Sequence, residues 1–324
     1  MPTKKTRVLV CGGTGFIGRN MLEYFGKRED CVVTATYHKT EPVGHPQVEM
    51  VKADLTNPDD VKKIMENQDV VIQAAATTSG ANDIVNRPYL HVTDNALMNS
   101  LLFKEAFEAK IKHMIFFSCT VMYHSQEEPL KESDYDANRD IYPKYFGVGW
   151  TKVYLEKMCE FFSSISDTKF TAIRHSNIYG PYDKYDLVRS HVFGATVAKV
   201  MDRSKDEIVV WGAGEEKRDL LYVDDLVSLV DLIVQKQKNP FELVNAGLGE
   251  AVAIKDLVAK VVDASGRDLK ISYDTSKPTL KTSLCLDCSK AKKEFSWSPS
   301  HSLDEGIKKT LDWYKTEFEA DNKA

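Results

Sequence analysis

Three glycines follow a short apolar strand near the start of the chain, at a spacing that suits the binding of a phosphate group. Residues 8–10 lead into Gly12, Gly15 and Gly18, and an amphipathic helical pattern follows. Glycine permits a tight turn off the strand, a close approach of the backbone to a pyrophosphate, and close packing of the helix on the sheet. The N–H groups of the helix N-terminus then face the anion. This order of strand, turn and helix predicts a dinucleotide site rather than a purely structural turn. The expected contacts are Gly12, Thr14, Gly15, Phe16, Ile17 and Gly18.

The elements that must position these residues form a repeating pattern. Strand-like apolar runs alternate with helical stretches, at residues 8–10, 32–36, 48–51, 70–74, 114–117 and 170–173. The alternation predicts an α/β fold with a doubly wound parallel sheet of the Rossmann type and right-handed crossovers. In such sheets ligands bind outside the carboxyl ends of the strands, so the residues that follow each strand carry the chemistry.

The residues after the second, third and fourth strands indicate which cofactor binds. His38 and Lys39 stand where an enzyme that uses NAD usually has an acid for the ribose hydroxyls, and basic groups suit the 2′-phosphate of NADP better. We therefore expect NADP or NAD, with NADP favoured; an exposed polar loop without contacts is the alternative. Small or acidic residues follow the next two strands, where a flat cofactor can lie on the sheet edge, although the alanines also suit plain packing. These residues are Asp54, Leu55, Ala74, Ala75 and Ala76.

Composition and charge narrow the class of protein. The 324 residues are 43% hydrophobic, enough for one large α/β core or two smaller ones, and no segment is apolar over the length of a membrane span. The net charge of -5 argues against a general nucleic-acid surface. The first strand begins too early for a signal peptide, so we expect a cytoplasmic protein that binds neither membrane nor nucleic acid.

The six cysteines predict neither disulfides nor a metal site. Several lie inside apolar patterns, which is typical of reduced core thiols. Cys285 and Cys288 form a Cys-x-x-Cys motif, but no second pair and no cluster of histidines accompanies it. We therefore expect no metal.

The regular alternation of strand-like and helical stretches ends after about residue 179. Loops around Gly180, Pro181, Gly212 and Gly214 follow, and a helical pattern covers residues 303–314. We predict a smaller, partly interleaved second domain that binds substrate. Residues 1–179 with 222–247 would form the dinucleotide-binding domain, and residues 180–221 with 248–324 the substrate domain.

Further motifs extend along nearly the whole chain. They are Asp54-Leu55, Ala74-Ala75-Ala76, Asn95, Lys152 with Glu156, Arg174-x-x-Asn177-x-Tyr179-Gly180-Pro181, Arg218-Asp219-x-x-Tyr222-Val223-Asp224-Asp225, Ser276-Lys277-Pro278 and Trp297-x-Pro299. With the glycine turn, they resemble the extended short-chain dehydrogenase/reductase family, which contains NAD-dependent sugar-nucleotide epimerases, dehydratases and reductases. Its GDP-fucose synthase branch is the most similar, through residues 74–80, 179–183, 190–192 and 210–214.

The resemblance implies a nicotinamide cofactor on the first domain and a nucleoside diphosphate sugar held by the second. Asn95 and Lys152 are then further cofactor contacts. Asn177 and Arg218 supply an amide donor and a fixed cation for the diphosphate. The alternatives are a surface ion pair between Arg218 and Asp219, and a turn capped by Asn177. Ser283 stands where the family has a second arginine, and Lys281 lies nearby as a further candidate for substrate binding.

The catalytic motif departs from the family at one position. Lys152 is present, but Val148 replaces the tyrosine, four residues earlier, whose phenol exchanges a proton with the sugar hydroxyl in the family. Valine carries no proton. Tyr145 lies about 10 Å from Lys152 along a helix, so it can replace the missing tyrosine only if Gly147 and Gly149 let the segment bend. Aromatic packing is the alternative role for Tyr145.

The resemblance offers other groups for proton transfer. Cys119 stands where the family has the Ser or Thr that hydrogen-bonds the reacting oxygen, and Thr120 follows it. A nearby Lys152 would lower the pKa of the Cys119 thiol. His191 matches the histidine with which GDP-fucose synthase epimerises ring carbons, whereas the cysteine of that reaction falls on Val121. Since side chains two apart on a strand point the same way, Cys119 could substitute. A structural histidine is the alternative for His191.

Two classes of function remain. The first, which we favour, is an NAD(P)-dependent oxidoreductase or epimerase that transfers a hydride at a carbon of a nucleoside diphosphate sugar, most simply C4 of a GDP sugar. Lys152 would then bind the nicotinamide ribose. The second is a non-catalytic or regulatory protein that binds the same ligands. The family commonly dimerises through two helices, which correspond here to residues 92–109 and 150–163, so we expect a homodimer.

Overall fold

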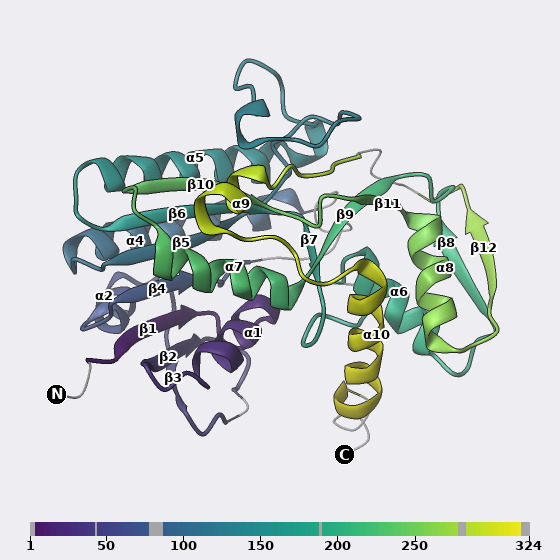
Figure 1. Cartoon of the computed structure of the whole chain (residues 1–324), viewed down its shortest axis with the longest axis horizontal. Helices are drawn as coiled ribbons and strands as arrows, with labels where there is room; N and C mark the ends of the chain where they lie inside the picture. Colours follow the sequence, from purple (N-terminus) through teal and green to yellow (C-terminus); the bar gives the residue numbers. More distant parts are fainter. Residues whose placement is uncertain (1–3, 43, 78–86, 188–189, 278–282, 319–324) are drawn as a thin grey trace.

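A seven-stranded parallel sheet forms the larger part of the molecule (Figure 1). The computed structural model describes residues 4–42, 44–77, 87–187, 190–277 and 283–318. The strand order is β10-β6-β5-β4-β1-β2-β3, and every neighbouring pair is parallel. The strands are β1 (Thr6–Cys11), β2 (Cys31–Tyr37), β3 (Val48–Lys52), β4 (Val70–Gln73), β5 (His113–Ser118), β6 (Lys169–His175) and β10 (Phe241–Ala246). This confirms the doubly wound sheet, whose order reverses between β1 and β4.

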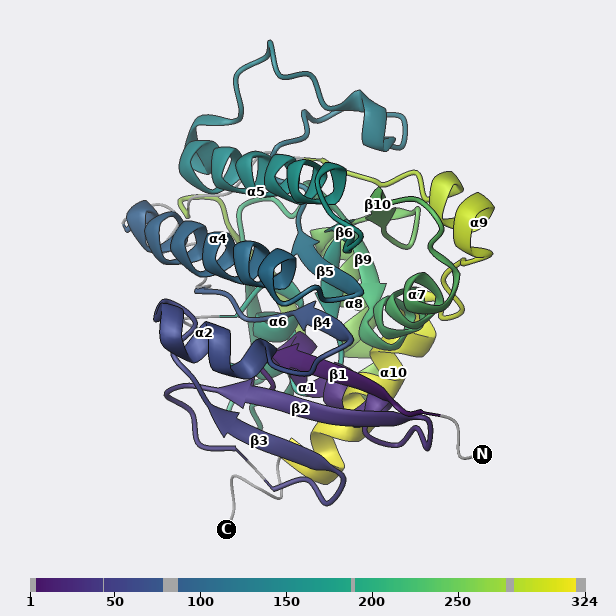
Figure 2. The ribbon, with the colours of Figure 1, turned by 90° about the vertical axis from the view of Figure 1, so that its left-hand side faces the viewer.

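Helices cover both faces of this sheet, as Figure 2 shows. One face carries α1 (Phe16–Phe25), α7 (Val223–Lys236) and α9 (Ser289–Phe295), and the other carries α2 (Pro58–Met65), α4 (Thr93–Glu108) and α5 (Phe146–Ser164). Successive side chains of a strand point to opposite faces, so Ile115 and Phe117 enter one apolar core while Met114 and Phe116 enter the other. Because the side chains on both faces of the sheet are buried, the strands consist of nearly continuous apolar runs in the sequence.

A second group of elements lies beyond the carboxyl ends of the large sheet (Figure 1). A three-stranded sheet of order β11-β9-β7 and a pair β12-β8 pack with three helices around a separate apolar core. The elements are β7 (Asn177–Tyr179), α6 (Val192–Met201), β8 (Glu207–Trp211), β9 (Lys217–Tyr222), β11 (Ala251–Ala253), α8 (Ile254–Ser265), β12 (Lys270–Asp274) and α10 (Leu303–Trp313), which continues as a wider turn over Tyr314–Phe318. Because β6 leads into β7 after one residue, the ends of β5 and β6 lie at the junction of the two sheets.

In the described connections, short helical turns cover Pro88–His91, Glu132–Asp134 and Pro143–Tyr145. Near the end of the chain, Ala291, Phe295 and Trp297 return to the core of the large sheet, so this part of the expected substrate domain packs on the dinucleotide-binding domain. Within the described residues, no helix combines the length and apolarity that a membrane crossing requires.

Candidate active site

The glycine turn after β1 has the geometry that its spacing predicted. Gly12 has φ of +78°, and a Cβ there would lie 2.7 Å from the Cα of Ala75. A Cβ on Gly18 would lie 2.1 Å from the carbonyl oxygen of Gly12. Both positions therefore require glycine. Gly15, by contrast, is exposed at the start of α1, where the absence of a side chain leaves the backbone open to a ligand.

The first backbone amides of α1 lie at this turn. The first intrahelical bond runs from the Arg19 N–H to the Gly15 carbonyl at 2.7 Å, so the N–H groups of Phe16, Ile17 and Gly18 precede it at the positive end of α1. The half-buried Thr14 completes the turn. This cradle fits a pyrophosphate.

Thr36 of β2 anchors the turn, a role that no motif indicated. Its hydroxyl accepts a hydrogen bond from the Gly12 N–H at 2.9 Å, and its carbonyl accepts one from the Gly13 N–H at 2.7 Å. These two hydrogen bonds hold the glycine turn against β2.

The ends of β2 and β3 bring two basic residues and one carboxylate together. His38 Nε2 lies 3.9 Å from Asp54 Oδ2. Hydrogen bonds from the amide and hydroxyl of Thr56 lower the pKa of Asp54, and the nearby His38 and Lys39 lower it further. The expected contact Leu55 instead buries its side chain in the core beside α2, so only its backbone is available to a ligand.

A buried polar network supports the segment after β4. Gln73 donates to the carbonyl of Ala75 at 3.1 Å and to Asn99 Oδ1 at 3.0 Å. Asn95 accepts from the Thr77 amide at 3.0 Å and donates to the carbonyls of Thr77 and His91. Both N–H groups and one lone pair of the Asn95 side chain are engaged, so Asn95 holds Thr77, which directly follows Ala74, Ala75 and Ala76.

Lys152 lies on α5 at the carboxyl end of β5. Its Nζ donates to the Phe117 carbonyl at 2.7 Å and lies 4.6 Å from the centre of the Phe116 ring. Burial lowers the pKa of the Lys152 amine, although Cys119 and Glu156 oppose this shift. Val148 is half-buried one turn earlier on the same helix face.

Cys119 and Thr120 follow β5 directly and are half-buried beside Lys152. The expected effect of Lys152 on the thiol is present, because its charge lowers the pKa of Cys119. Burial acts in the opposite direction and is the larger effect, so the pKa of Cys119 is raised overall. The prediction of a depressed thiol pKa is therefore wrong, and Cys119 stays a protonated thiol at neutral pH.

Tyr145 does not take the place of the missing tyrosine in this structure. It precedes α5, which is helical from Phe146 onward without the bend that replacement requires. Gly147 and Gly149 serve packing instead, because a Cβ at these positions would lie 2.8 Å from Val92 and 2.9 Å from Ile141. The ring of Tyr145 packs edge-on against that of Tyr142, and its hydroxyl raises the pKa of Arg218 against the larger effect of burial.

A buried ion pair fixes α5 against β6. Arg174 donates to both carboxylate oxygens of Glu156, at 3.0 and 2.6 Å, and Ser118 donates to the same carboxylate. Arg174 also donates to the Tyr123 hydroxyl at 2.9 Å. Glu156 lies one turn after Lys152 on α5, and its charge raises the pKa of the Lys152 amine against the larger effect of burial.

The residues expected to hold a diphosphate lie on the small sheet. Asn177 on β7 donates to the Asp219 carbonyl at 3.1 Å and so ties β7 to β9 instead of capping a turn. Arg218 is half-buried at the start of β9, and its Nη1 donates to the Lys217 carbonyl at 2.8 Å. Lys281 lies outside the described residues.

Asp219 is fully buried, which excludes the surface ion pair with Arg218. It accepts hydrogen bonds from the amides of Leu248, Gly249 and Leu286 at 2.8, 3.3 and 3.0 Å. Burial nevertheless raises the pKa of Asp219 to about 6. Asp219 therefore holds the loops around Arg218 in place.

His191 immediately precedes α6, where its side chain is exposed. The protein packed around the ring still desolvates it and so lowers the pKa of His191, and the charges of Lys184 and His91 act in the same direction. His191 is therefore a neutral imidazole at physiological pH.

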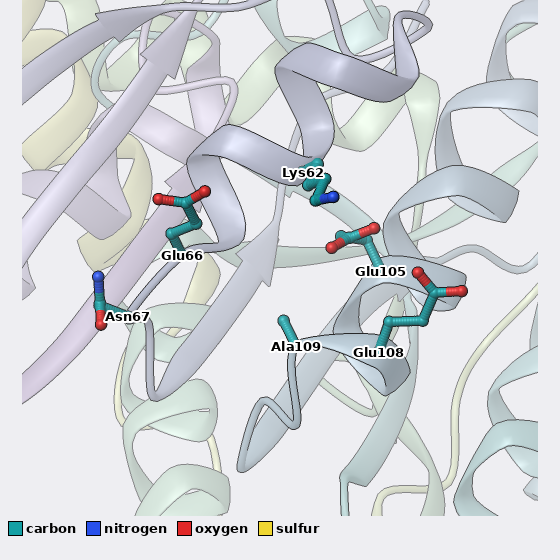
Figure 3. Close-up of a pocket in the computed structure, with 6 residues that line it drawn as sticks. All are labelled: Lys62, Glu66, Asn67, Glu105, Glu108 and Ala109. Carbon is teal, nitrogen blue, oxygen red and sulfur yellow. The ribbon is translucent and has the colours of Figure 1, made fainter.

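A hollow of about 570 Å³ lies far from these groups, between the C-terminal ends of α2 and α4 (Figure 3). Its lining includes Lys62, Glu66, Glu105 and Glu108. These helix ends precede β4 and β5, so the hollow opens at the amino edge of the sheet, opposite the glycine turn. Its carboxylates would repel a phosphate, and we assign it no part in the site.

A doubly wound sheet, a glycine turn beside its switch point and a second sheet beyond the strand ends define a protein of the Rossmann-fold class. The chain belongs to the NAD dependent epimerase/dehydratase family, whose sequence pattern matches residues 8–247.

Curated relatives match this chain over nearly their whole length. GDP-L-fucose synthase of Azorhizobium caulinodans is 25% identical over 97% of both chains. dTDP-4-dehydro-6-deoxy-D-allose reductase of a Streptomyces species is 26% identical and is matched over 96% of its length by 95% of this chain. Among solved structures, UDP-glucose 4-epimerase of Thermotoga maritima has a TM-score of 0.85 at 23% identity, with 97% of this chain and all of that chain covered. These similarities confirm the fold expected from the sequence.

Proposed function

We propose that this protein is an NAD(P)-dependent oxidoreductase or epimerase of the cytoplasm that acts on a nucleoside diphosphate sugar, in the first place a GDP sugar, by hydride transfer at C4. One observation carries the proposal: Lys152 lies at the carboxyl end of β5, in the same edge of the sheet as the glycine cradle at β1. Two strand spacings separate them, about 10 Å, a distance that a dinucleotide spans. The named activities of the relatives support the substrate class.

The cradle amides around Gly15 would hold the pyrophosphate of the cofactor, and Ala75 and Ala76 would border its path along the sheet edge. When bound, the nicotinamide accepts or supplies a hydride. His38 and Lys39 favour NADP, because they offset the single carboxylate of Asp54 where a 2′-phosphate would lie.

The substrate would lie across the junction of the two sheets. Arg218 and Asn177 would bind its diphosphate, with Lys281 as a further cation, which places the sugar toward Lys152. Lys152 would bind the nicotinamide ribose. A proton-transfer group is then still required. The candidates from sequence are Cys119, Thr120, Tyr145 and His191, of which the regular start of α5 disfavours Tyr145.

The outer face of α4 and α5 supports a homodimer. Leu97, Trp150, Tyr154 and Phe161 are between 37% and 56% exposed there, and Figure 2 shows the two helices side by side in the outer layer. Exposed apolar side chains that follow one helix face are typical of an interface. A second copy of this chain would cover them with the same surface.

The test is a panel of GDP, UDP, dTDP and CDP sugars and their 4-keto forms, incubated with NAD(H) or NADP(H). Absorbance at 340 nm reports cofactor oxidation or reduction, and mass spectrometry reports the sugar product. Turnover with one nucleotide sugar supports the enzyme. Val148 motivates the alternative of a non-catalytic binding protein, which the panel supports if cofactor and sugar nucleotide bind without any conversion.

A further inference from the structure

The carboxyl end of β6 carries a histidine that no sequence motif singled out. His175 is the last residue of β6, and the register pairs Phe117 with Ile173 and Ser118 with Arg174. His175 follows Arg174 at the end of β6, as Cys119 follows Ser118 directly after β5. The His175 ring lies 6.2 Å from the ring of Phe117, the residue whose carbonyl accepts the Lys152 amine.

The hydrogen bonding of His175 fixes its tautomer. Nδ1 lies 2.7 Å from the Ser176 carbonyl oxygen. A carbonyl only accepts hydrogen bonds, so Nδ1 carries the hydrogen and Nε2 carries the lone pair. The half-buried ring thus offers a base at the strand end.

The surroundings keep this imidazole neutral. Burial is the largest influence and lowers the pKa of His175 to about 4, and Lys152 from α5 and His191 before α6 act in the same direction. The Ser176 carbonyl opposes them. Cys119 holds its proton under the same conditions, so the thiol can donate but not accept.

We propose that His175 replaces the absent tyrosine as the group that exchanges a proton with the reacting sugar hydroxyl, an assignment that rests on the proposed function. In oxidation the hydroxyl proton passes to Nε2, the C–H electron pair leaves as a hydride to the oxidised nicotinamide, and the C–O bond becomes a carbonyl. In reduction the carbonyl carbon receives the hydride while the imidazolium returns its proton to the oxygen. The Lys152 cation disfavours the imidazolium, which makes it a strong acid toward the developing alkoxide.

The test compares His175→Gln with the wild-type protein, each in the oligomeric state in which it is purified. The assay measures reduction of a GDP-linked 4-keto sugar by NADPH. We expect kcat to fall about 100-fold or more, the loss typical of a missing general acid, while the affinity for NADPH in fluorescence titration is unchanged. The wild-type reduction rate depends on the imidazolium, so it should fall with rising pH between 5 and 8, and the variant should lose this dependence. Exogenous imidazole should restore part of the activity of His175→Ala.

A matched control is His113→Gln. His113 is a buried histidine at the start of β5, at the opposite edge of the same sheet. Burial lowers the pKa of His113 to about 4 as well, and its Nε2 forms hydrogen bonds with the side chains of Thr171 and Gln237. Its substitution costs stability but should leave the kcat of the folded enzyme at the wild-type value.

Chemical modification tests the assignment without a variant. Diethyl pyrocarbonate reacts with neutral imidazole, so mass spectrometry of the wild-type protein should find modification of His175 that NADPH and the nucleotide sugar prevent, in step with inactivation. If the wild type converts no sugar on the panel, the proposed function fails and this assignment with it. If the wild type is active and His175→Gln keeps its kcat and pH profile, only the assignment to His175 is overturned.

Discussion

At the scale of single residues, the site combines positions that spacing identifies with positions that only the folded chain defines. The four-residue step between Val148 and Lys152 placed both on one face of α5, as predicted. The direction of the pKa shift of Cys119 was predicted wrongly. Burial decides this direction, and the spacing of residues in the sequence does not report burial. His175 was missed for the same reason, since its tautomer and neutrality arise from Ser176 and from the packing around the strand end.

The substitution Val148→Tyr tests how far the missing phenol limits the chemistry. A phenol one turn before Lys152 would lie beside its cation, which favours the phenolate and supplies a proton-transfer group at the family position. We expect kcat for reduction of the 4-keto sugar to rise at least 10-fold. Val148→Phe adds the ring without the hydroxyl and should not raise kcat. Equal rates for V148Y and wild type would show that position 148 does not face the reacting atoms.

Asp183 offers a residue-scale test of stability against pH. It is buried, its Oδ1 accepts from the Lys184 amide at 2.7 Å, and its Oδ2 has no hydrogen-bond partner within the described part of the chain. Burial raises the pKa of Asp183 from 3.8 to about 7. The folded state therefore holds this proton more tightly than the unfolded state, and the contribution of Asp183 to the free energy of unfolding should fall as pH rises from about 4 to 7.

The variant Asp183→Asn keeps the acceptor for Lys184 and removes the charge. Thermal unfolding should show that its stability relative to wild type increases between pH 5 and pH 8, whatever their difference at pH 5. A difference that stays constant over this range would contradict a protonated Asp183.

At the scale of elements, local signals were sufficient wherever a segment carries its own cap or period. Asn57 accepts hydrogen bonds from the Asp59 and Asp60 amides and is followed by Pro58, so the start of α2 is marked by residue types in the sequence itself. The seventh strand, β10, was not predicted as a strand because its alternating half-buried start lacks a continuous apolar run. The polar network of Gln73, Asn95 and Asn99 joins separate elements, so no local pattern could indicate it.

The ion pair between Glu156 and Arg174 makes a prediction for the packing of α5. Both side chains are nearly inaccessible to solvent, so Glu156→Gln leaves a buried guanidinium without its counter-charge and should lower the free energy of unfolding by about 3–5 kcal/mol. Urea denaturation measures the change. Glu160→Gln on the same helix breaks the exposed pair with Lys157 and should change stability little. Equal effects of the two variants would contradict the structural role of the buried pair.

At the scale of the whole molecule, the two sheets meet where the proposed reacting groups lie. Ser118 and His175 end the large sheet, while Asn177 and Arg218 belong to the small one. A change in the separation of the two parts therefore changes the distance between the expected diphosphate and hydride sites. The helix α5 carries Lys152 near this junction, and α4 and α5 also expose the apolar face, so the proposed dimer interface and the proposed site would share α5.

A homodimer through this face predicts that a charge at its centre separates the subunits. Trp150→Glu and Phe161→Glu together place two carboxylates on the exposed face of α5, and desolvating them against their copies would cost more than the apolar contact contributes. Sedimentation at micromolar concentration should find the wild type as a dimer and the double variant as a monomer. Trp211→Glu changes a comparably exposed tryptophan on β8, away from α4 and α5, and should leave the dimer intact. A wild type that sediments as a monomer, or a dimer that only Trp211→Glu disrupts, would rule out this interface.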